Sequence, residues 1–184
     1  MSTNNYIRTF TGKQFYPFQM HRNEYDIHDI AHALSNLCRY NGHSKLFYSV
    51  GQHSVYVSKL VSREDALEAL LHDAAEAYIG DIPRPMKRTL PFADFCEIER
   101  EIELGVARTF NLKFPWPMAV RHADEMILAL EMAHILHGAE SGTEGEPLPL
   151  IDHQWIERMI DGFEPWAPLR AEEEFILRFN ELRP

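Results

Sequence analysis

A histidine, an aspartate and a glutamate lie close together in the segment ALLHDAAEAYIGD, residues 69–81. His72 and Glu76 are four residues apart, and Asp73 and Glu76 are three apart, so on a helix the three side chains share one face. By periodicity alone, an ordinary amphipathic helix explains this pattern as well as a functional site does. A solvent-exposed face would, however, also carry lysine or arginine, and residues 64–83 contain neither. The composition around the three residues therefore favours a site.

A second unusual feature lies in the segment MAVRHADEMILALEMAHILHG, residues 118–138. At a helical rotation of about 100° per residue, Asp124 and Glu131 fall in the middle of the apolar arc of this segment. A carboxylate directed into a core is costly unless it is paired or binds a metal ion. Taken alone, this segment favours a buried salt bridge to an arginine such as Arg121 or Arg39. A metal site is the alternative that both segments share.

Imidazole and carboxylate groups from separate helices form the mixed nitrogen and oxygen ligand set that suits divalent Mn, Fe, Co, Ni or Zn. A di-iron carboxylate bundle would need paired E-x-x-H motifs, and no second copy is present. Cys38 and Cys96 form no CxxC motif, which excludes a zinc site built mainly from thiolates. The sequence therefore predicts a site of histidines and carboxylates for a divalent ion.

Three motifs give these residues a wider context: QHS at residues 52–54, HDAAEAYIGDIPRP at 72–85 and HADEMIL at 122–128. With them, the sequence resembles the HD-domain metal-dependent phosphohydrolases. It is most similar to the branch that contains bacterial 5′-deoxynucleotidases and small phage dATP triphosphohydrolases. The resemblance extends from about Ile27 to Glu131, and the last fifty or so residues show none.

The resemblance implies a role for particular residues. The implied metal ligands are His53, His72, Asp73 and Asp124. Glu76 corresponds to the acid that handles the attacking water, and Asp81 to a second carboxylate at the mouth of the site.

The segment CRY, residues 38–40, resembles an Arg-Trp pair of the deoxynucleotidases. By this correspondence Arg39 binds phosphate and Tyr40 lies against the nucleoside. Because the chain has tyrosine where the pair has tryptophan, its base or sugar selectivity is open. Lys87, after PRPM, is a further candidate for contact with phosphate.

The activity implied is hydrolysis of deoxynucleotide phosphate esters. A dNMP would give deoxynucleoside and phosphate, or a dNTP such as dATP would give deoxynucleoside and triphosphate. One divalent ion (Mn, Co, Zn, Mg, Fe or Ni) would activate the water. Two alternatives stay open: a cyclic-nucleotide phosphodiesterase of the same fold, and a non-catalytic nucleotide-binding HD protein. The complete set of metal ligands and catalytic acid favours the enzyme. The sequence has no P-loop motif, so ATP-driven chemistry is not indicated.

The elements that would position these residues are helical. Helical periodicity predicts helices in residues 26–40, with Gly42 as the stop, and in 48–61, 65–79, 92–112, 118–138, 153–163 and 169–183. Residues 1–25 read as a short hairpin or irregular lead-in, and residues 138–149 as an acidic loop rich in Gly and Pro. We expect an all-α fold, with residues 1–184 forming a single HD-type helical bundle domain.

The bulk composition agrees with an ordinary globular domain. The chain has 184 residues, of which 45% are hydrophobic and 25% charged. Its net charge of −10 disfavours a nucleic-acid polymer as a partner. No signal peptide and no long apolar run are visible, so we expect a cytoplasmic protein that does not bind membranes. We also expect a nucleotide as the substrate and a homo-oligomeric assembly.

Overall fold

The computed structural model describes residues 5–136 and 152–183, and helices make up most of it. The α-helices are α1 (Ile27–Asn36), α2 (Val50–Lys59), α3 (Ala66–Leu71), α4 (Glu76–Ile79), α5 (Arg84–Lys87), α6 (Ala93–Phe110), α7 (Met118–Ile135), α8 (His153–Met159) and α9 (Pro168–Leu182). Short 3-10 turns are η1 (Met20–Arg22), η2 (Arg39–Gly42) and η3 (Leu90–Phe92). The predicted all-α class is confirmed, in one compact domain.

Within the predicted lead-in at residues 1–25, the chain forms a small hairpin. β1 (Ile7–Arg8) pairs antiparallel with β2 (Gln14–Phe15), and Ile7 lies opposite Phe15. The hairpin that the sequence suggested there is therefore present. The acidic loop expected at residues 138–149 lies outside the described residues.

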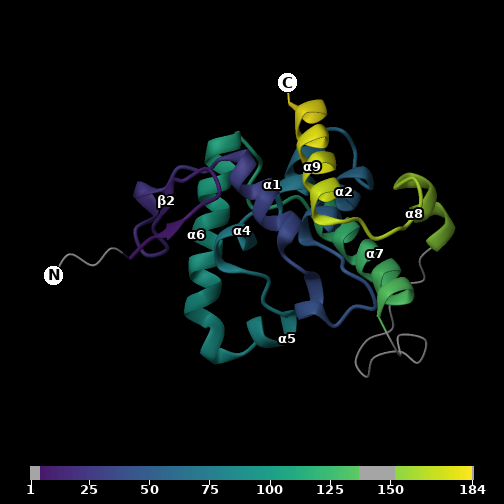
Figure 1. The fold of residues 1–184 in the computed structure, drawn as a ribbon, viewed down its shortest axis with the longest axis horizontal. Helices are drawn as coiled ribbons and strands as arrows, with labels where there is room; N and C mark the ends of the chain where they lie inside the picture. Colours follow the sequence, from purple (N-terminus) through teal and green to yellow (C-terminus); the bar gives the residue numbers. More distant parts are fainter. Residues whose placement is uncertain (1–4, 137–151, 184) are drawn as a thin grey trace.

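Helix α2 is the centre of the fold. Residues 50–58 are all buried, and the helix packs against α1, α3, α7 and α9 (Figure 1). Gly51 lets α1 approach closely, because a Cβ atom at this position would lie 3.0 Å from the backbone nitrogen of Ser35. A side chain on the inner face of α2, such as His53, is thus held on all sides by other helices.

Helix α1 ends at Asn36, so the predicted continuation to residue 40 is wrong. The backbone after Leu37 pairs with the start of α2 instead: the Arg39 amide donates to the Tyr48 carbonyl at 2.9 Å, and the Val50 amide donates to the Leu37 carbonyl at 3.0 Å. Non-local pairing therefore replaces the last turns of the helix. It sets Arg39 in the turn η2, beside the next helix, rather than at a helix end.

The continuous helix predicted for residues 65–79 is also wrong, because it breaks at the His-Asp pair. α3 ends at Leu71 and α4 begins at Glu76, and between them the hydrogen bonds tighten to a spacing of three residues, as from the Ala74 amide to the Leu71 carbonyl at 3.1 Å. The His72 ring donates a hydrogen bond from Nδ1 to the Ala69 carbonyl, at 2.8 Å. That contact lies at the position where the helix breaks.

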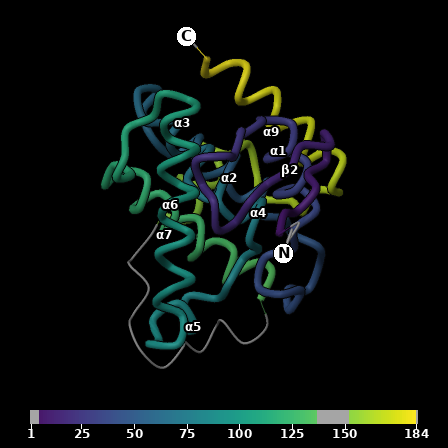
Figure 2. Tube along the Cα trace, turned by 90° about the vertical axis from the view of Figure 1, so that its left-hand side faces the viewer, coloured from purple at the N-terminus to yellow at the C-terminus, as the bar shows by residue number. Residues whose placement is uncertain are grey.

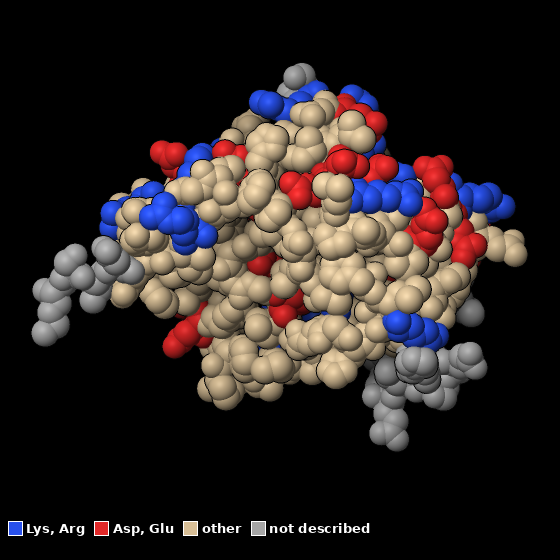
Figure 3. All heavy atoms as spheres, viewed as in Figure 1, with Lys and Arg blue, Asp and Glu red and all other residues tan. Residues whose placement is uncertain are grey.

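Helix α5 and the C-terminal end of α9 lie at opposite edges of the molecule, across its longest axis (Figure 1). Figures 1 and 2, which view the molecule at right angles, both place the end of α9 at the top and α5 at the bottom. On the face drawn in Figure 3, basic and acidic side chains alternate along the upper edge, and a small charged group lies recessed near the centre. Among the described helices, none combines the length and the apolar character needed to cross a membrane.

Candidate metal centre and adjoining cavity

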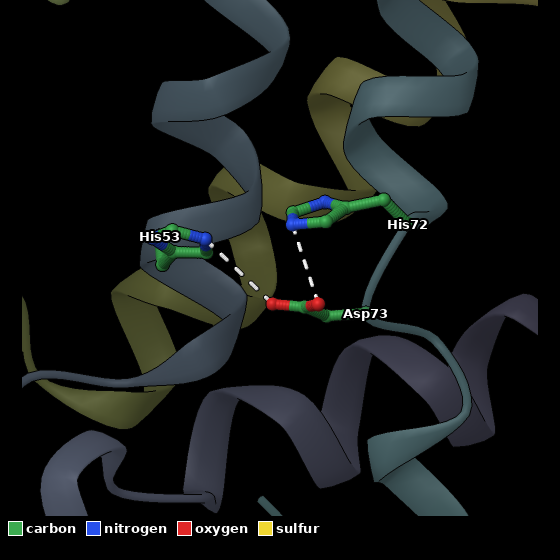
Figure 4. A group of neighbouring side chains, drawn as sticks. All are labelled: His53, His72 and Asp73. Carbon is green, nitrogen blue, oxygen red and sulfur yellow. Dashed lines mark ion pairs between the residues drawn. The ribbon is translucent and has the colours of Figure 1, made fainter. Parts of the chain in front are cut away.

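Two imidazoles and one carboxylate meet where α2 faces the break between α3 and α4. His53 comes from the middle of α2, His72 from the end of α3, and Asp73 from the following turn. Each offers a ligand atom, and these atoms lie within 4.8 Å of one another. The Asp73 carboxylate points between the rings, 3.6 Å from His53 Nε2 and 3.2 Å from His72 Nε2 (Figure 4). This group could hold a metal ion.

Both imidazoles are oriented by a hydrogen bond at Nδ1. His53 Nδ1 lies 2.7 Å from Glu131 Oε1, and His72 Nδ1 lies 2.8 Å from the Ala69 carbonyl. Both partners are acceptors, so each Nδ1 carries the hydrogen and each Nε2 faces Asp73. Within the described part of the chain, these two buried Nε2 atoms have no hydrogen-bond partner. Such an orientation, set by a contact on the far side of the ring, is typical of histidines that bind metal ions.

Asp124, the fourth predicted ligand, reaches the edge of this group from α7. Its Oδ1 lies 3.2 Å from His53 Nε2, and its Oδ2 accepts a hydrogen bond from Arg84. Burial works to raise the pKa of Asp124, but the close contact with His53 and the charges of the two histidines and Arg84 outweigh it and hold that pKa well below its usual value. Three of the predicted ligands form the group, and Asp124 adjoins it.

Glu131, the partner of His53 Nδ1, is fully buried, with 0% of the residue exposed. Its Oε2 accepts from the Tyr40 hydroxyl and lies 3.3 Å from the Arg39 guanidinium, so the carboxylate is paired. An arginine partner for this residue was one of the sequence-based interpretations, and Arg39 is that partner. Burial raises the pKa of Glu131, but the charges of Arg39 and His53 dominate and lower it to about 2.

The same charges act on the proton of His53. Burial and the Arg39 charge lower the pKa of His53, but Glu131 and Asp124 outweigh them and raise it to about 9. Binding of an ion at Nε2 would therefore release a proton.

A cavity of about 330 Å³ opens beside this group, at the lower end of the range for small-molecule sites. Its charged and polar lining is Arg39, Tyr40, Asp73, Glu76, Asp81, Arg84, Lys87 and Asp124, and its apolar lining is Ile82, Pro83, Pro85, Leu128, Met132 and Leu136. Every residue predicted for the site lines this cavity except His53 and His72, which are buried deeper. The fold thus brings the predicted residues together.

Glu76 lies in the cavity with its charge poorly compensated. The residue is 7% exposed, and its Oε2 has no hydrogen-bond partner among the described residues. Its Oε1 lies 3.5 Å from Lys87 Nζ, which is held more closely by Glu99 at 2.6 Å. Burial, together with the negative charges of Asp73 and Asp81, raises the pKa of Glu76 well above its usual value. A buried carboxyl group with a raised pKa is suited to exchange a proton with a neighbouring molecule.

Asp81, which also lines the cavity, has a similar environment. Burial raises its pKa, the charge of Asp73 adds to the effect, and Arg39 opposes it. Two carboxyl groups with raised pKa values therefore share the cavity.

The sequence interpretation missed two contacts of this site. The first is the orientation of His53 by Glu131, which α7 brings together across 78 residues of sequence. The second is Arg84, which lines the cavity and pairs with Asp124. The first had a usable signal, because Glu131 lies two helical turns after Asp124. For Arg84 the only signal was its place three residues before Lys87.

Comparison with known proteins gives relatives along nearly the whole chain. No model of a known protein family matches it. The chain is 40% identical over 177 residues to the uncharacterized protein YfdR of Escherichia coli, covering 96% of this chain and 95% of YfdR. It is 30% identical over 169 residues to the uncharacterized protein RCAP_rcc00048 of Rhodobacter capsulatus, covering 83% of this chain and 86% of that protein. The chain belongs to the family that includes YfdR of Escherichia coli.

Proposed function

We propose that this protein is an HD-type phosphohydrolase that depends on a divalent metal ion and acts on the phosphate esters of deoxynucleotides. The observation that carries the proposal is the pair of buried, unpartnered Nε2 atoms of His53 and His72, which face Asp73 beside the cavity. Buried nitrogen atoms without a partner are costly, and a divalent ion would satisfy both of them. The order of the motifs along the chain supports the same proposal.

His53, His72 and Asp73 would hold the ion, with Asp124 as the fourth ligand. An ion bound by this set would polarise a water molecule and the phosphoryl oxygens and would offset negative charge on the phosphorus. The residues fit such an ion, because both rings direct Nε2 toward the same point and because a carboxylate lies between them. His53, whose pKa is raised to about 9, would give up its Nε2 proton on binding.

Glu76 would act as the general base. Its free Oε2 takes a proton from water while the water oxygen forms a bond to phosphorus. The bond from phosphorus to the leaving oxygen breaks, and that oxygen takes a proton. Asp81, whose pKa burial raises, can carry the proton to it. The products are a deoxynucleoside and either phosphate or triphosphate.

The lining of the cavity suits a molecule with one charged and one apolar end. Arg39 and Lys87 would contact the phosphate, and the α7 side chains Leu128 and Met132 would pack against the base. The Tyr40 hydroxyl already donates to Glu131, so it is the ring of Tyr40 that would touch the nucleoside. Substrates would then be distinguished at Tyr40 by shape more than by hydrogen bonding.

The test is a panel of dNMPs, NMPs, dNTPs and cyclic nucleotides, each with Mn, Co, Mg and Zn, with the products separated by chromatography. We expect metal-dependent release of phosphate or triphosphate from deoxynucleotides. Glu76→Gln should keep about one equivalent of metal but lose activity by roughly 10²–10⁴-fold, as for other general bases. Asp73→Ala should lose the metal, and Glu97→Gln, at an exposed position of α6, serves as the control.

Other results would select other functions. Opening of cyclic nucleotides alone would make the protein a phosphodiesterase, and nucleotide binding without turnover on any metal would make it a binding protein. If the purified protein takes up no divalent ion, or if Glu76→Gln retains activity within threefold of the wild type, the proposal is wrong.

A further inference from the structure

Arg84 is the first residue of α5 and stands at the wall of the cavity. Its guanidinium donates to Asp124 Oδ2, and 52% of its side chain is exposed. Pro83 and Pro85 on either side also line the cavity and restrict the backbone there. Arg84 is therefore a charged group on a stiff segment, with part of its side chain open to whatever enters.

The other two cations of the cavity are already engaged with carboxylates. Arg39 is 12% exposed and lies between Glu131, at 3.3 Å, and Asp73, at 3.6 Å. Lys87 lies between Glu99, at 2.6 Å, and Glu76, at 3.5 Å. Each has two carboxylate partners among the described residues, whereas Arg84 has one.

Arg84 also has donors to spare. A guanidinium has five N–H groups in a fixed plane, and the bond to Asp124 uses a single amino group. The remaining groups match the oxygens of a phosphate, which arginine binds in a two-pronged geometry.

The position of Arg84 follows from the carboxylate that holds it. Asp124 contacts Arg84 through one oxygen and approaches His53 Nε2 to 3.2 Å through the other. A single carboxylate, that of Asp124, thus lies between Arg84 and the His53–His72–Asp73 group. An anion held at that group comes within reach of the guanidinium.

We propose that Arg84 is a phosphate-binding residue of this cavity and that Asp124 holds it in place for that role. The inference rests on the proposed function, since it takes the anion to be the phosphoryl group of the substrate. Arg39, besides its contact with phosphate, keeps Asp73 and Glu131 in position, and Arg84 adds charge that favours phosphorylated over unphosphorylated nucleosides.

The test measures binding rather than turnover. Inorganic phosphate and, separately, uncharged deoxyadenosine are titrated into the Mn-loaded protein in a calorimeter, for the wild type, Arg84→Ala, Arg84→Lys and Arg88→Ala. Arg88 follows one turn later, is exposed and is not part of the lining, so it is the matched control. We expect phosphate to bind Arg84→Ala at least about tenfold more weakly, with a smaller loss for Arg84→Lys, which keeps the charge but not the planar fork.

Deoxyadenosine binding should be unchanged in every variant, and phosphate binding by Arg88→Ala should match the wild type. Thermal unfolding of each variant checks that the fold is kept. Phosphate binding by Arg84→Ala within twofold of the wild type, or no measurable phosphate binding by the wild type, would overturn the inference.

The two proposals fail in different ways. If the wild type takes up no Mn, the proposed function fails, and the same phosphate titration of the metal-free proteins still decides the role of Arg84. If Mn binds normally but Arg84→Ala does not affect phosphate, the role of Arg84 alone is wrong.

Discussion

At the scale of single residues, Glu131 connects the candidate metal centre with residues that line the adjoining cavity. Its carboxylate accepts from His53 on one oxygen, and from Tyr40, with Arg39 close by, on the other. A buried carboxylate with three partners orients each of them, so a change at Glu131 should alter the positions of all three side chains.

Glu131→Gln tests this connection. The amide keeps the shape but removes the charge, which leaves Arg39 with Asp73 as its remaining carboxylate and weakens the hold on His53. We expect Mn affinity to fall by about 10–100-fold, as for other contacts that orient metal ligands. Disrupting a buried charge pair should lower the free energy of unfolding by roughly 3–5 kcal/mol. Calorimetry and urea unfolding measure these effects, with exposed Glu125→Gln on the same helix as the control; unchanged Mn affinity would mean that Glu131 does not orient His53.

Glu103 on α6 gives a prediction for pH. Burial, together with the charges of Glu99 and Asp73, raises the pKa of Glu103 to about 7, although its hydrogen bond from Trp116 at 3.1 Å and the charge of Lys87 oppose this. The folded protein therefore prefers the protonated carboxyl, and stability is lost as the pH rises from the unfolded value of about 4.5 through 7.

Glu103→Gln should remove this loss while still accepting from Trp116. We expect the variant to gain stability relative to the wild type between pH 5 and pH 8, by about 2 kcal/mol in the free energy of unfolding. Urea unfolding at both pH values measures it, and Glu97→Gln, exposed on the same helix, should show no such change. An equal effect of Glu103→Gln at both pH values would contradict the assignment.

Local spacing in the sequence was enough to predict part of the site. His72, Asp73 and Glu76 lie within one short segment, and Asp124 and Glu131 stood out because they interrupt an apolar arc. Local spacing could not predict the contact of Glu131 with His53 or that of Arg84 with Asp124. Which partner a buried carboxylate selects depends on how α2 and α7 meet, and a segment as short as α5 has no periodicity from which the direction of Arg84 could be inferred.

At the scale of elements, the contact between α1 and α2 sets the position of His53. Gly51 lies two residues before it, and a Cβ there would come within 2.7 Å of Ser35 Oγ and 3.0 Å of the Ser35 backbone nitrogen. The Ser35 hydroxyl can rotate away, but the Ser35 nitrogen belongs to the backbone of α1 and cannot. The close packing of the two helices therefore depends on the missing side chain.

Gly51→Ala should push these helices apart. Overpacking costs about 1–3 kcal/mol, and the better helix propensity of alanine returns up to about 1 kcal/mol of it. We expect a net loss of stability in urea unfolding, together with weaker Mn binding because His53 shifts. Ser35 Oγ has no hydrogen-bond partner among the described residues, so Ser35→Ala should be mild alone and should recover part of the loss in the double variant. A Gly51→Ala variant as stable as the wild type would show that the contact is not tight.

The long helices were predictable from periodicity, and the short ones and the breaks were not. α6 and α7 repeat the apolar pattern over many turns and appear where the sequence placed them. The end of α1 and the break after α3 depend on contacts outside the helix or across its own turn, such as the Arg39 amide with Tyr48 and the His72 ring with Ala69. Periodicity alone contains no information about such contacts.

At the scale of the whole molecule, the helices around α2 bring residues distant in sequence to one point. The candidate centre takes His53 from α2, His72 and Asp73 from the break after α3, and Asp124 from α7. The packing of α3 and α7 against α2 joins them. The site is therefore a property of the assembled domain and of no single element.

The bond between His53 and Glu131 also has a consequence for biosynthesis. The ribosome makes His53, His72 and Asp73 early, while Glu131 follows 78 residues after His53, near the end of α7. Until that helix emerges and docks, nothing orients the His53 ring, and the Arg39 guanidinium lacks its buried counterion. A nascent chain thus carries the side chains of the candidate centre well before the helix that orients them is made. If the proposed function holds, ion binding should therefore follow the docking of α7.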